Sequence, residues 1–190
     1  MCVSMDEAGF SGTILYCGRR LHPEHGRIEV LGYQNTAVNL AAGPNAMLLH
    51  LPARSVTSAQ FLPASRSGRV LRDMVDAVRP AAAGPGAGGA GWTGAAAMSH
   101  AEVFRHDICT VVLADGAAHI PAALERVEPR KRPAPNHGLL EFYADLYPGY
   151  PIAPCCLGNA DAAEARPLLP WYQPLEHDRM VLPAIDCHPG

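Results

Sequence analysis

Runs of apolar residues in the first third of the chain predict three β-strands. The stretch "GTILYCGRR" mixes β-branched and aromatic residues and predicts a strand near residues 12–18, and "GRIEVLGYQN" predicts a second strand near 27–34. The turn-forming "LHPEHG" between them indicates a β-hairpin. The almost wholly apolar "AMLLHLP" predicts a buried strand at 46–51, whereas "NTAVNLAAGPN" before it is expected to form a loop.

A helical period appears later in the sequence. Apolar residues recur every three or four positions in "SGRVLRDMVDAVRP", which predicts an amphipathic helix that ends at Pro80. "HIPAALERVE" predicts a short helix with Pro121 in its first turn. "NHGLLEFYADLYPG" predicts a further helix, with Asn136 as its N-cap and Pro148 at its end.

The remaining segments predict strands and one irregular stretch. "EVFRHDICTVVLADG" contains an apolar centre at 108–113 that predicts a core strand. "YPIAPCCLGN" predicts a short strand confined to a sheet edge, because Pro151 and Pro154 cannot donate hydrogen bonds. "DRMVLPAIDCHPG" predicts a last strand. The Gly/Ala-rich residues 81–98 show no period and are expected to form a flexible loop or insertion.

This order of elements places strands at both ends of the chain and helices between them. It favours an α+β fold: a mainly antiparallel sheet built from the N-terminal hairpin and C-terminal strands, with two or three helices packed on it. A length of 190 residues suits one domain spanning 1–190.

Composition excludes several partners. The net charge of −3 argues against nucleic acid, since phosphate binding needs a concentrated basic face. No apolar stretch is long enough to cross a membrane, and no signal peptide is evident. We therefore expect a cytoplasmic protein in which the six cysteines remain thiols.

The opening "MCVSMDEAGF" offers the sharpest chemical hypothesis. Removal of Met1 leaves Cys2 with a thiol and a free α-amine on one residue. Because an α-amine titrates near pH 8, it can act as general base for its own thiol. Cys2 is thus a candidate nucleophile for hydrolysis of an amide or acyl bond in a small molecule or peptide.

Such a nucleophile needs donors for the oxyanion that forms on the attacked carbonyl. "GYQNTAVNLAAGPNAM" supplies side-chain amides, of which Asn35 and Asn45 are the candidate oxyanion donors. Gln34, Arg19 and Arg20 are candidate substrate-binding residues, the arginines for an acidic group.

Two resemblances accompany these residues. The Cys2 start with nearby strands and amides is similar to the N-terminal-nucleophile hydrolases, which implies a four-layer fold with the nucleophile on the first strand. "LGYQNTAVNLAAGPNAMLLHLPA" and "WYQPLEHDRMVLPAIDCHPG" resemble segments of a bacterial family of unassigned activity whose members also begin with Met-Cys. The second resemblance implies no reaction.

Three alternatives stay open. "HPEH" places His22 and His25 three residues apart, but no further metal-binding motif accompanies them, so we expect neither a metal nor another cofactor. A Cys/His hydrolase with an internal nucleophile would use Cys155 or Cys156, which follow a proline and are expected to be exposed, rather than Cys109, which is expected in the core. Aromatic residues in "LYPGYPIAP" and "LLPWYQPLEH" fit a non-catalytic binding or assembly module.

Overall fold

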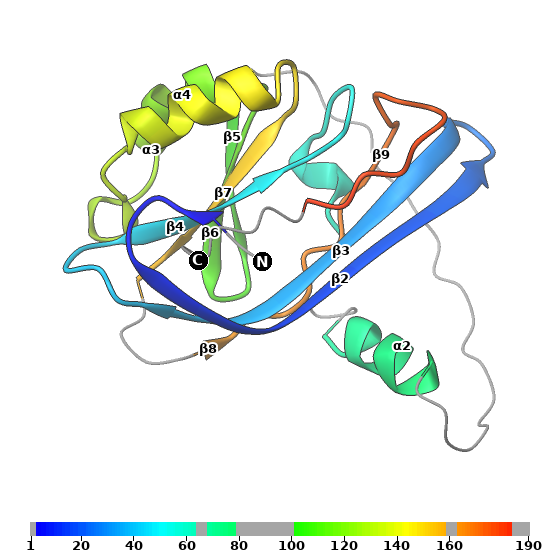
Figure 1. Cartoon of the computed structure of the whole chain (residues 1–190), viewed down its shortest axis with the longest axis horizontal. Helices are drawn as coiled ribbons and strands as arrows, with labels where there is room; N and C mark the ends of the chain where they lie inside the picture. The colour runs from blue at the N-terminus through cyan, green and yellow to red at the C-terminus, as the bar shows by residue number, and fades with distance from the viewer. Residues whose placement is uncertain (1–2, 64–67, 79–100, 159–162, 184–190) are drawn as a thin grey trace.

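The computed structural model describes residues 3–63, 68–78, 101–158 and 163–183, which form two antiparallel sheets and three helices (Figure 1). The strands are β1 (Val3–Ser4), β2 (Ala8–His22), β3 (Gly26–Asn39), β4 (Asn45–His50), β5 (Ala101–His106), β6 (Cys109–Ala114), β7 (Ile152–Leu157), β8 (Ala163–Glu164) and β9 (Trp171–Tyr172). The helices are α2 (Val70–Val78), α3 (Ile120–Leu124) and α4 (His137–Leu146). The α+β fold with mainly antiparallel sheets is therefore confirmed.

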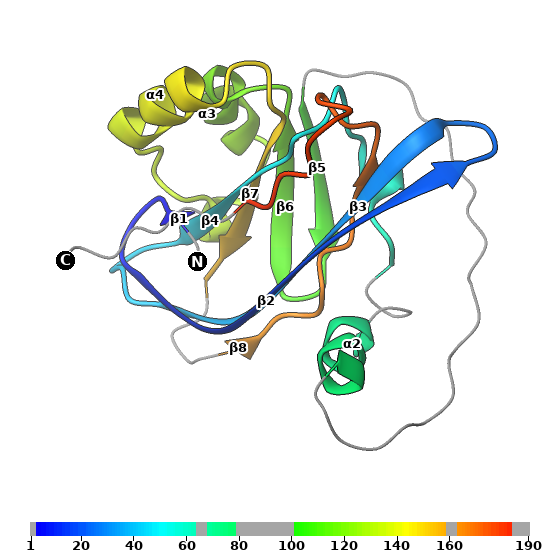
Figure 2. The same ribbon diagram turned by 45° about the vertical axis from the view of Figure 1, so that its right-hand side comes forward.

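The larger sheet has five strands in the order β1-β4-β7-β6-β5, and all its pairs are antiparallel. Every residue of its central strands β4 and β7 is buried. Since successive side chains of a strand point to opposite sides, both faces of the sheet are covered. Met47 and Leu49 enter one apolar core, whereas Ala46 and Leu48 enter the other. The second core lies under α3 and α4, which cover that face (Figure 2).

The smaller sheet is the long β2–β3 hairpin, extended by β8 and β9, which both pair with β3. The inward residues of β3, including Leu31 and Tyr33, pack with Met47 and Leu49 in the core between the sheets. Helix α2 lies against the outer face, where Leu71 meets Gly32. The layers thus run helix, sheet, sheet, helix (Figure 1).

Two expectations about strand positions are corrected. Strand β3 continues to Asn39, so the first part of "NTAVNLAAGPN" is strand rather than loop; Thr36 and Asn39 pair with Ser11 and Ala8 of β2. Strand β7 is central rather than an edge, although it contains Pro154.

Pro154 is tolerated because the ladder is interrupted beside it. The pairs between β6 and β7 are Thr110 with Cys156, Val111 with Cys155 and Ala114 with Ile152, so none falls at Pro154. On the other side, Pro154 is opposite Leu48 of β4. A missing N–H therefore leaves only a local gap in one ladder.

The segment "EVFRHDICTVVLADG" forms two strands rather than one. Strands β5 and β6 make a tight hairpin in which His106 pairs with Cys109. Asp107 in the turn has a φ of 54°, a left-handed conformation that Asp adopts more readily than most residues. At the C-terminal end of the described residues, 178–183 contain no strand; the rest of that predicted strand and the 81–98 loop lie outside the described residues.

The helices match their sequence signals closely. Asn136 caps α4 as expected, since its Oδ1 accepts a hydrogen bond from the Leu139 N–H at 3.1 Å. In α2 only Leu71 is fully buried, whereas Met74 and Val78 on the same apolar stripe are 41% and 81% exposed. No helix in the described residues is long and apolar enough to cross a membrane.

A histidine is buried beneath α4. His50 ends β4, and its ring stacks on Tyr147 with centroids 3.9 Å apart, between Tyr143 and Tyr150. Burial lowers the pKa of His50 from its usual 6.5 to about 4. The folded protein therefore holds this imidazole in its neutral form.

The close approach of α2 to the hairpin predicts the effect of Gly32→Ala. A Cβ at Gly32 would lie 2.7 Å from Leu71 Cδ2 and 3.0 Å from Tyr16 Cβ. We expect this overpacking to lower the free energy of unfolding by about 1–3 kcal/mol, measured by urea denaturation. Gly43→Ala is the control, because a Cβ there meets nothing within 4 Å. Equal stability of the two variants would contradict the packing of α2 on this face.

The buried His50 predicts a pH dependence of stability. Between pH 6.5 and pH 4 the unfolded chain binds a proton at His50 while the folded chain does not, so stability falls as the pH falls, by at most about 3 kcal/mol. His50→Phe keeps a stacked ring but removes this titration, and should flatten the curve of unfolding free energy against pH. The exposed His137, replaced by Gln, is the control. An unchanged slope in His50→Phe would refute the assignment.

Candidate functional site

The N-terminal strand adjoins a set of buried polar side chains. Strand β1 begins at Val3, directly after the candidate nucleophile Cys2, which lies outside the described residues. Ser4 pairs with Met47 of β4, and the Met5 N–H donates to the Ala46 carbonyl at 2.8 Å. The start of the described chain is thus bound to the edge of the five-stranded sheet.

Asn45 holds this segment in place with every hydrogen-bonding group of its amide. Its Oδ1 accepts from the N–H of Asp6 at 3.0 Å and of Ala46 at 2.8 Å. Its Nδ2 donates to the carbonyls of Asp6 and Glu7, both at 3.0 Å. An oxyanion could recruit Asn45 only by displacing a backbone carbonyl, so its evident role is structural.

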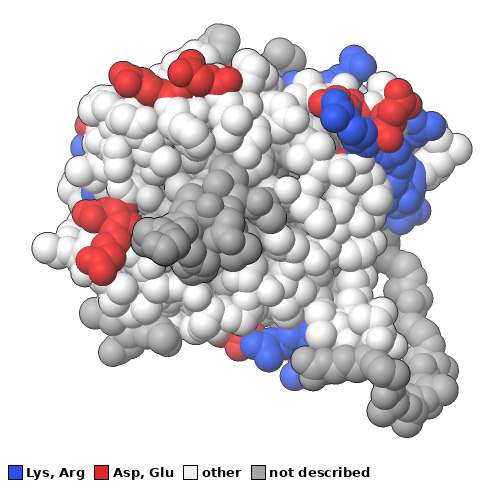
Figure 3. All heavy atoms as spheres, in the orientation of Figure 1, with Lys and Arg blue, Asp and Glu red and all other residues white. Residues whose placement is uncertain are grey.

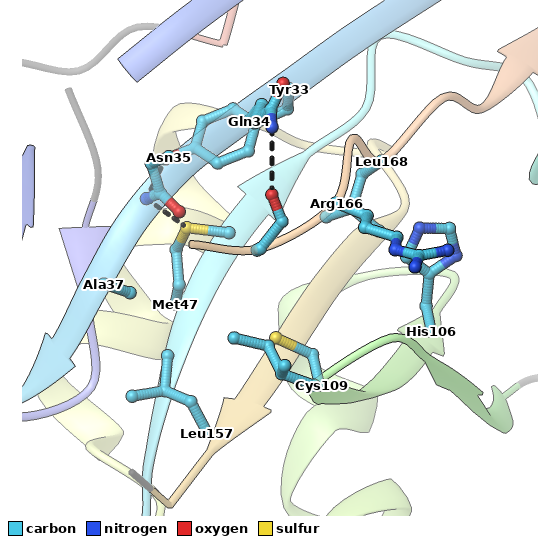
Figure 4. Close-up of a pocket in the computed structure, with 12 residues that line it drawn as sticks. Tyr33, Gln34, Asn35, Ala37, Met47, His106, Cys109, Leu157, Arg166 and Leu168 are labelled. Carbon is cyan, nitrogen blue, oxygen red and sulfur yellow. Dashed lines mark hydrogen bonds between the residues drawn. The ribbon is translucent and has the colours of Figure 1, made fainter. Parts of the chain in front are cut away.

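Asn35 uses its amide differently. It is 3% exposed on the inner face of β3, where Nδ2 donates to Tyr33 Oη at 3.0 Å. The same nitrogen lies 3.6 Å from the sulfur of Met47, which is a weak acceptor (Figure 4). One N–H of Asn35 is therefore directed at a partner that a charged oxygen would readily replace, and Met47 is the register partner of Ser4.

A small cavity opens beside Asn35, between the sheets. Its volume is about 20 Å³, room for a single water molecule. Figure 4 shows Asn35 and Met47 on one side and His106 and Arg166 on the other. The lining residues are Tyr33, Gln34, Asn35, Ala37, Met47, His106, Ile108, Cys109, Leu157, Ala165, Arg166 and Leu168.

His106 and Arg166 supply the polar groups of the far wall. His106 Nε2 lies 2.9 Å from the Pro167 carbonyl, which can only accept, so Nε2 carries the hydrogen. Burial lowers the pKa of His106, against the opposing effects of that carbonyl and of Asp107. The side chain of Arg166 is 52% exposed, with Nε 3.7 Å from Asp107 Oδ1.

The three predicted substrate-binding residues do not form one site: Arg19 and Arg20 are neighbours on β2 whose side chains point to opposite faces, and Gln34 lies on β3 opposite Ile14. Arg19 binds Glu29 and the carbonyls of His177 and Arg179, so its guanidinium is committed. Arg20 is exposed on the same strand. Gln34 lines the cavity but donates to Glu164 and Ala165, and its Oε1 is buried with no partner among the described residues.

The described cysteines are poor nucleophiles at neutral pH. Burial raises the pKa of Cys109 and of Cys156 to about 12, with further increases from Asp107 and Cys109 respectively. Burial, followed by the negative charge of Glu29, raises the pKa of Cys17 to about 11. Cys155 and Cys156 are fully buried, so their expected exposure was wrong; Cys109, expected in the core, packs against the core and also lines the cavity.

The predicted metal-binding pair serves the hairpin turn. His22 Nδ1 accepts hydrogen bonds from the N–H groups of Glu24 and His25. Both imidazoles lie against Trp171, with ring centroids 6.0 and 4.9 Å away. Within the described ranges, no three His, Cys, Asp or Glu side chains are grouped to hold a metal ion.

A second hollow lies on the opposite face of the hairpin. This groove lies between β2 and α2 and has a volume of about 380 Å³; apart from Tyr16, the residues in its lining have apolar side chains. Its lining residues are Ile14, Leu15, Tyr16, Leu71, Met74, Val75, Ala77 and Val78.

Sequence reasoning missed His106, Arg166, Met47 and Tyr33 as residues of the cavity. His106 and Arg166 come from a tight hairpin and from the chain after β8, so only tertiary contacts join them. Comparison of the chain with protein-family models, with curated proteins and with solved structures gave no match.

Proposed function

We propose that the chain is an N-terminal cysteine hydrolase that cleaves an amide or acyl bond after removal of Met1. The observation that supports it is the position of Asn35. Its Nδ2 lies 3.6 Å from the weakly accepting sulfur of Met47, and Met47 pairs with Ser4, two residues after Cys2. The helix–sheet–sheet–helix order is also compatible with the four-layer fold implied by the resemblance to N-terminal-nucleophile hydrolases.

In the proposed reaction the α-amine of Cys2 takes the thiol proton, directly or through a water molecule. The thiolate attacks the substrate carbonyl, and Asn35 Nδ2 donates to the oxyanion in place of its contact with Met47. The α-ammonium returns the proton to the leaving group. A water molecule, deprotonated by the same amine, then attacks the thioester; the C–S bond breaks, the acid leaves, and the α-ammonium returns its proton to the Cys2 thiolate. We place this reaction in the cytoplasm, where the thiol stays reduced.

The substrate would approach from the exposed side of the cavity. A volume of about 20 Å³ holds no substrate, so an acyl group must enter past Ile108 and Arg166, which are 38% and 52% exposed. Arg166 is better placed than Arg19 or Arg20 for an acidic substrate group, because it lines the cavity and its side chain is 52% exposed. His106 is a neutral donor on the same wall.

The test uses 4-nitrophenyl acetate as a general acyl donor, together with intact mass spectrometry. The protein without Met1 should release a stoichiometric burst of nitrophenolate and carry the acyl group on Cys2. Cys2→Ala should abolish the burst, whereas Cys17→Ala should leave it unchanged. Asn35→Ala should slow acylation about 10²–10³-fold, the usual effect of losing one oxyanion donor.

Asn39→Ala is the matched control for Asn35, since Asn39 is an amide on the same strand whose described side-chain contacts are with its own loop, at Gly43 and Ala41. Retention of Met1 in the native protein, or a burst that survives Cys2→Ala, would exclude the proposed hydrolase.

The second candidate function is a non-catalytic binding module, favoured by the apolar groove between β2 and α2. Its volume of about 380 Å³ falls in the range of small-molecule sites, and its lining suits an apolar ligand. In this function Cys2 has no chemical role.

Binding of the neutral dye Nile red tests this groove. Met74→Lys places a charge in the apolar lining and should weaken the dye's fluorescence response, since burying a charge in an apolar site is unfavourable. Phe142→Lys is the control, because Phe142 is a 50% exposed apolar residue on α4, away from the groove. Equal responses of the two variants would argue against a ligand site there, and binding that persists in Cys2→Ala would separate this function from hydrolysis.

A further inference from the structure

Three arginines from separate segments converge on His177. Arg19 of β2 and Arg27 of β3 both donate to the His177 carbonyl, at 2.8 and 3.2 Å. Arg54, which follows β4, places Nη2 3.3 Å from the His177 Nε2. Charged side chains gather at this end of the molecule, over the tip of the β2–β3 hairpin (upper right in Figure 3).

The charges in this cluster are unevenly balanced. Arg19 is neutralised by Glu29, which is 1% exposed, and Arg179 pairs with Glu176. Neither Arg27 nor Arg54 has a carboxylate within 4.0 Å among the described residues. Two guanidinium groups are therefore held close to one residue without a direct carboxylate partner among the described residues.

His177 meets these arginines only with neutral acceptors. A guanidinium can only donate, so His177 Nε2 must use its lone pair toward Arg54, and the second acceptor is a backbone carbonyl. Each guanidinium has five N–H groups, and only one from Arg27 and one from Arg54 is used in these contacts. Within the described part of the chain, most of their donors are thus available to a ligand.

The backbone around the two arginines is fixed in advance. The Arg54 N–H donates to the Gln173 carbonyl at 3.1 Å, and the Gln173 Nε2 donates to the His25 carbonyl in the hairpin turn at 2.8 Å. The Leu175 N–H also donates to the Pro52 carbonyl at 3.0 Å. These bonds hold the loop carrying Arg54 and the turn preceding Arg27 to the same segment, so little ordering is needed on binding.

We propose that Arg27 and Arg54, beside His177, form a binding site for a phosphate group. The planar fork of a guanidinium binds two oxygens of an oxyanion, and two guanidiniums without a direct carboxylate partner among the described residues match the charge of a phosphate dianion. The incoming oxygens take the place of the neutral acceptors that His177 supplies. This site does not depend on Cys2 or on the inter-sheet cavity.

Inorganic phosphate and glycerol 2-phosphate are the probes, titrated into the ¹⁵N-labelled protein at constant ionic strength. We expect saturable shifts of the amide signals of Arg27, Arg54 and His177. Arg27→Gln and Arg54→Gln should each weaken binding about tenfold, as expected for loss of a charge-assisted bidentate contact. Acetate, with a single charge and two oxygens, should bind more weakly than phosphate.

Arg20→Gln is the matched control, because Arg20 is an exposed arginine on the same hairpin. Its substitution removes the same charge as Arg27→Gln or Arg54→Gln. It should change the affinity less than twofold. If Arg20→Gln weakened phosphate binding as much as Arg54→Gln, the effect would come from the overall charge of the protein, and the proposed site would be wrong. The absence of saturable shifts would also overturn it. Tighter binding of glycerol 2-phosphate than of inorganic phosphate would support a phosphate group on a larger molecule, and the reverse a free ion.

Discussion

Burial of the five-stranded sheet on both faces is the constraint on which the rest of the structure depends. In β4 and β7 every residue is buried, and consecutive residues enter different cores. A slip of one residue would exchange the two sets of side chains, so the register is strongly specified. Polar residues stand only at the two ends of β4, where the Asn45 amide is fully hydrogen-bonded and the His50 ring is stacked on Tyr147 and kept neutral by its lowered pKa.

The hairpin that covers this sheet carries its polar groups at separate points along β3. Glu29 lies near the turn, where Arg19 and Tyr172 are its register partners, and Asn35 lies six residues further along the same inner face. At about 3.3 Å per residue, this separation is about 20 Å. The inter-sheet cavity and the arginine cluster thus both contain residues of β3, but they are too far apart for one side chain to contribute to both sites.

Local signals predicted those elements whose formation depends on neighbours in sequence. The hairpin follows from β-branched and aromatic residues around a turn-forming segment, the Asn136 cap from capping chemistry, and the amphipathic α2 from its helical period. The end of β3 was not predicted, because the segment around Asn39 has the composition of a loop. Its strand conformation depends on the pairing of Asn39 with Ala8. Likewise, Pro154 can lie in a central strand because the pairing between β6 and β7 is interrupted beside it, so no pair of that ladder falls at the residue that lacks an N–H. This interruption depends on another strand and cannot be predicted from the local sequence.

The candidate site was less predictable than the fold, since it depends on how hydrogen-bonding groups are used. Asn35 and Asn45 are equivalent in the sequence, yet Asn45 bonds to two carbonyls and two N–H groups.

Removing the Asn45 amide from these partners would leave buried backbone groups unsatisfied, at a cost of about 1–3 kcal/mol each. Asn35 instead directs an N–H at a thioether, a weaker partner whose loss costs less. A buried amide can stabilise a transient charge only if its ground-state partners are weaker than that charge. This condition separates Asn35 from Asn45, and it is met through Met47, a residue that carries no chemical signal in the sequence.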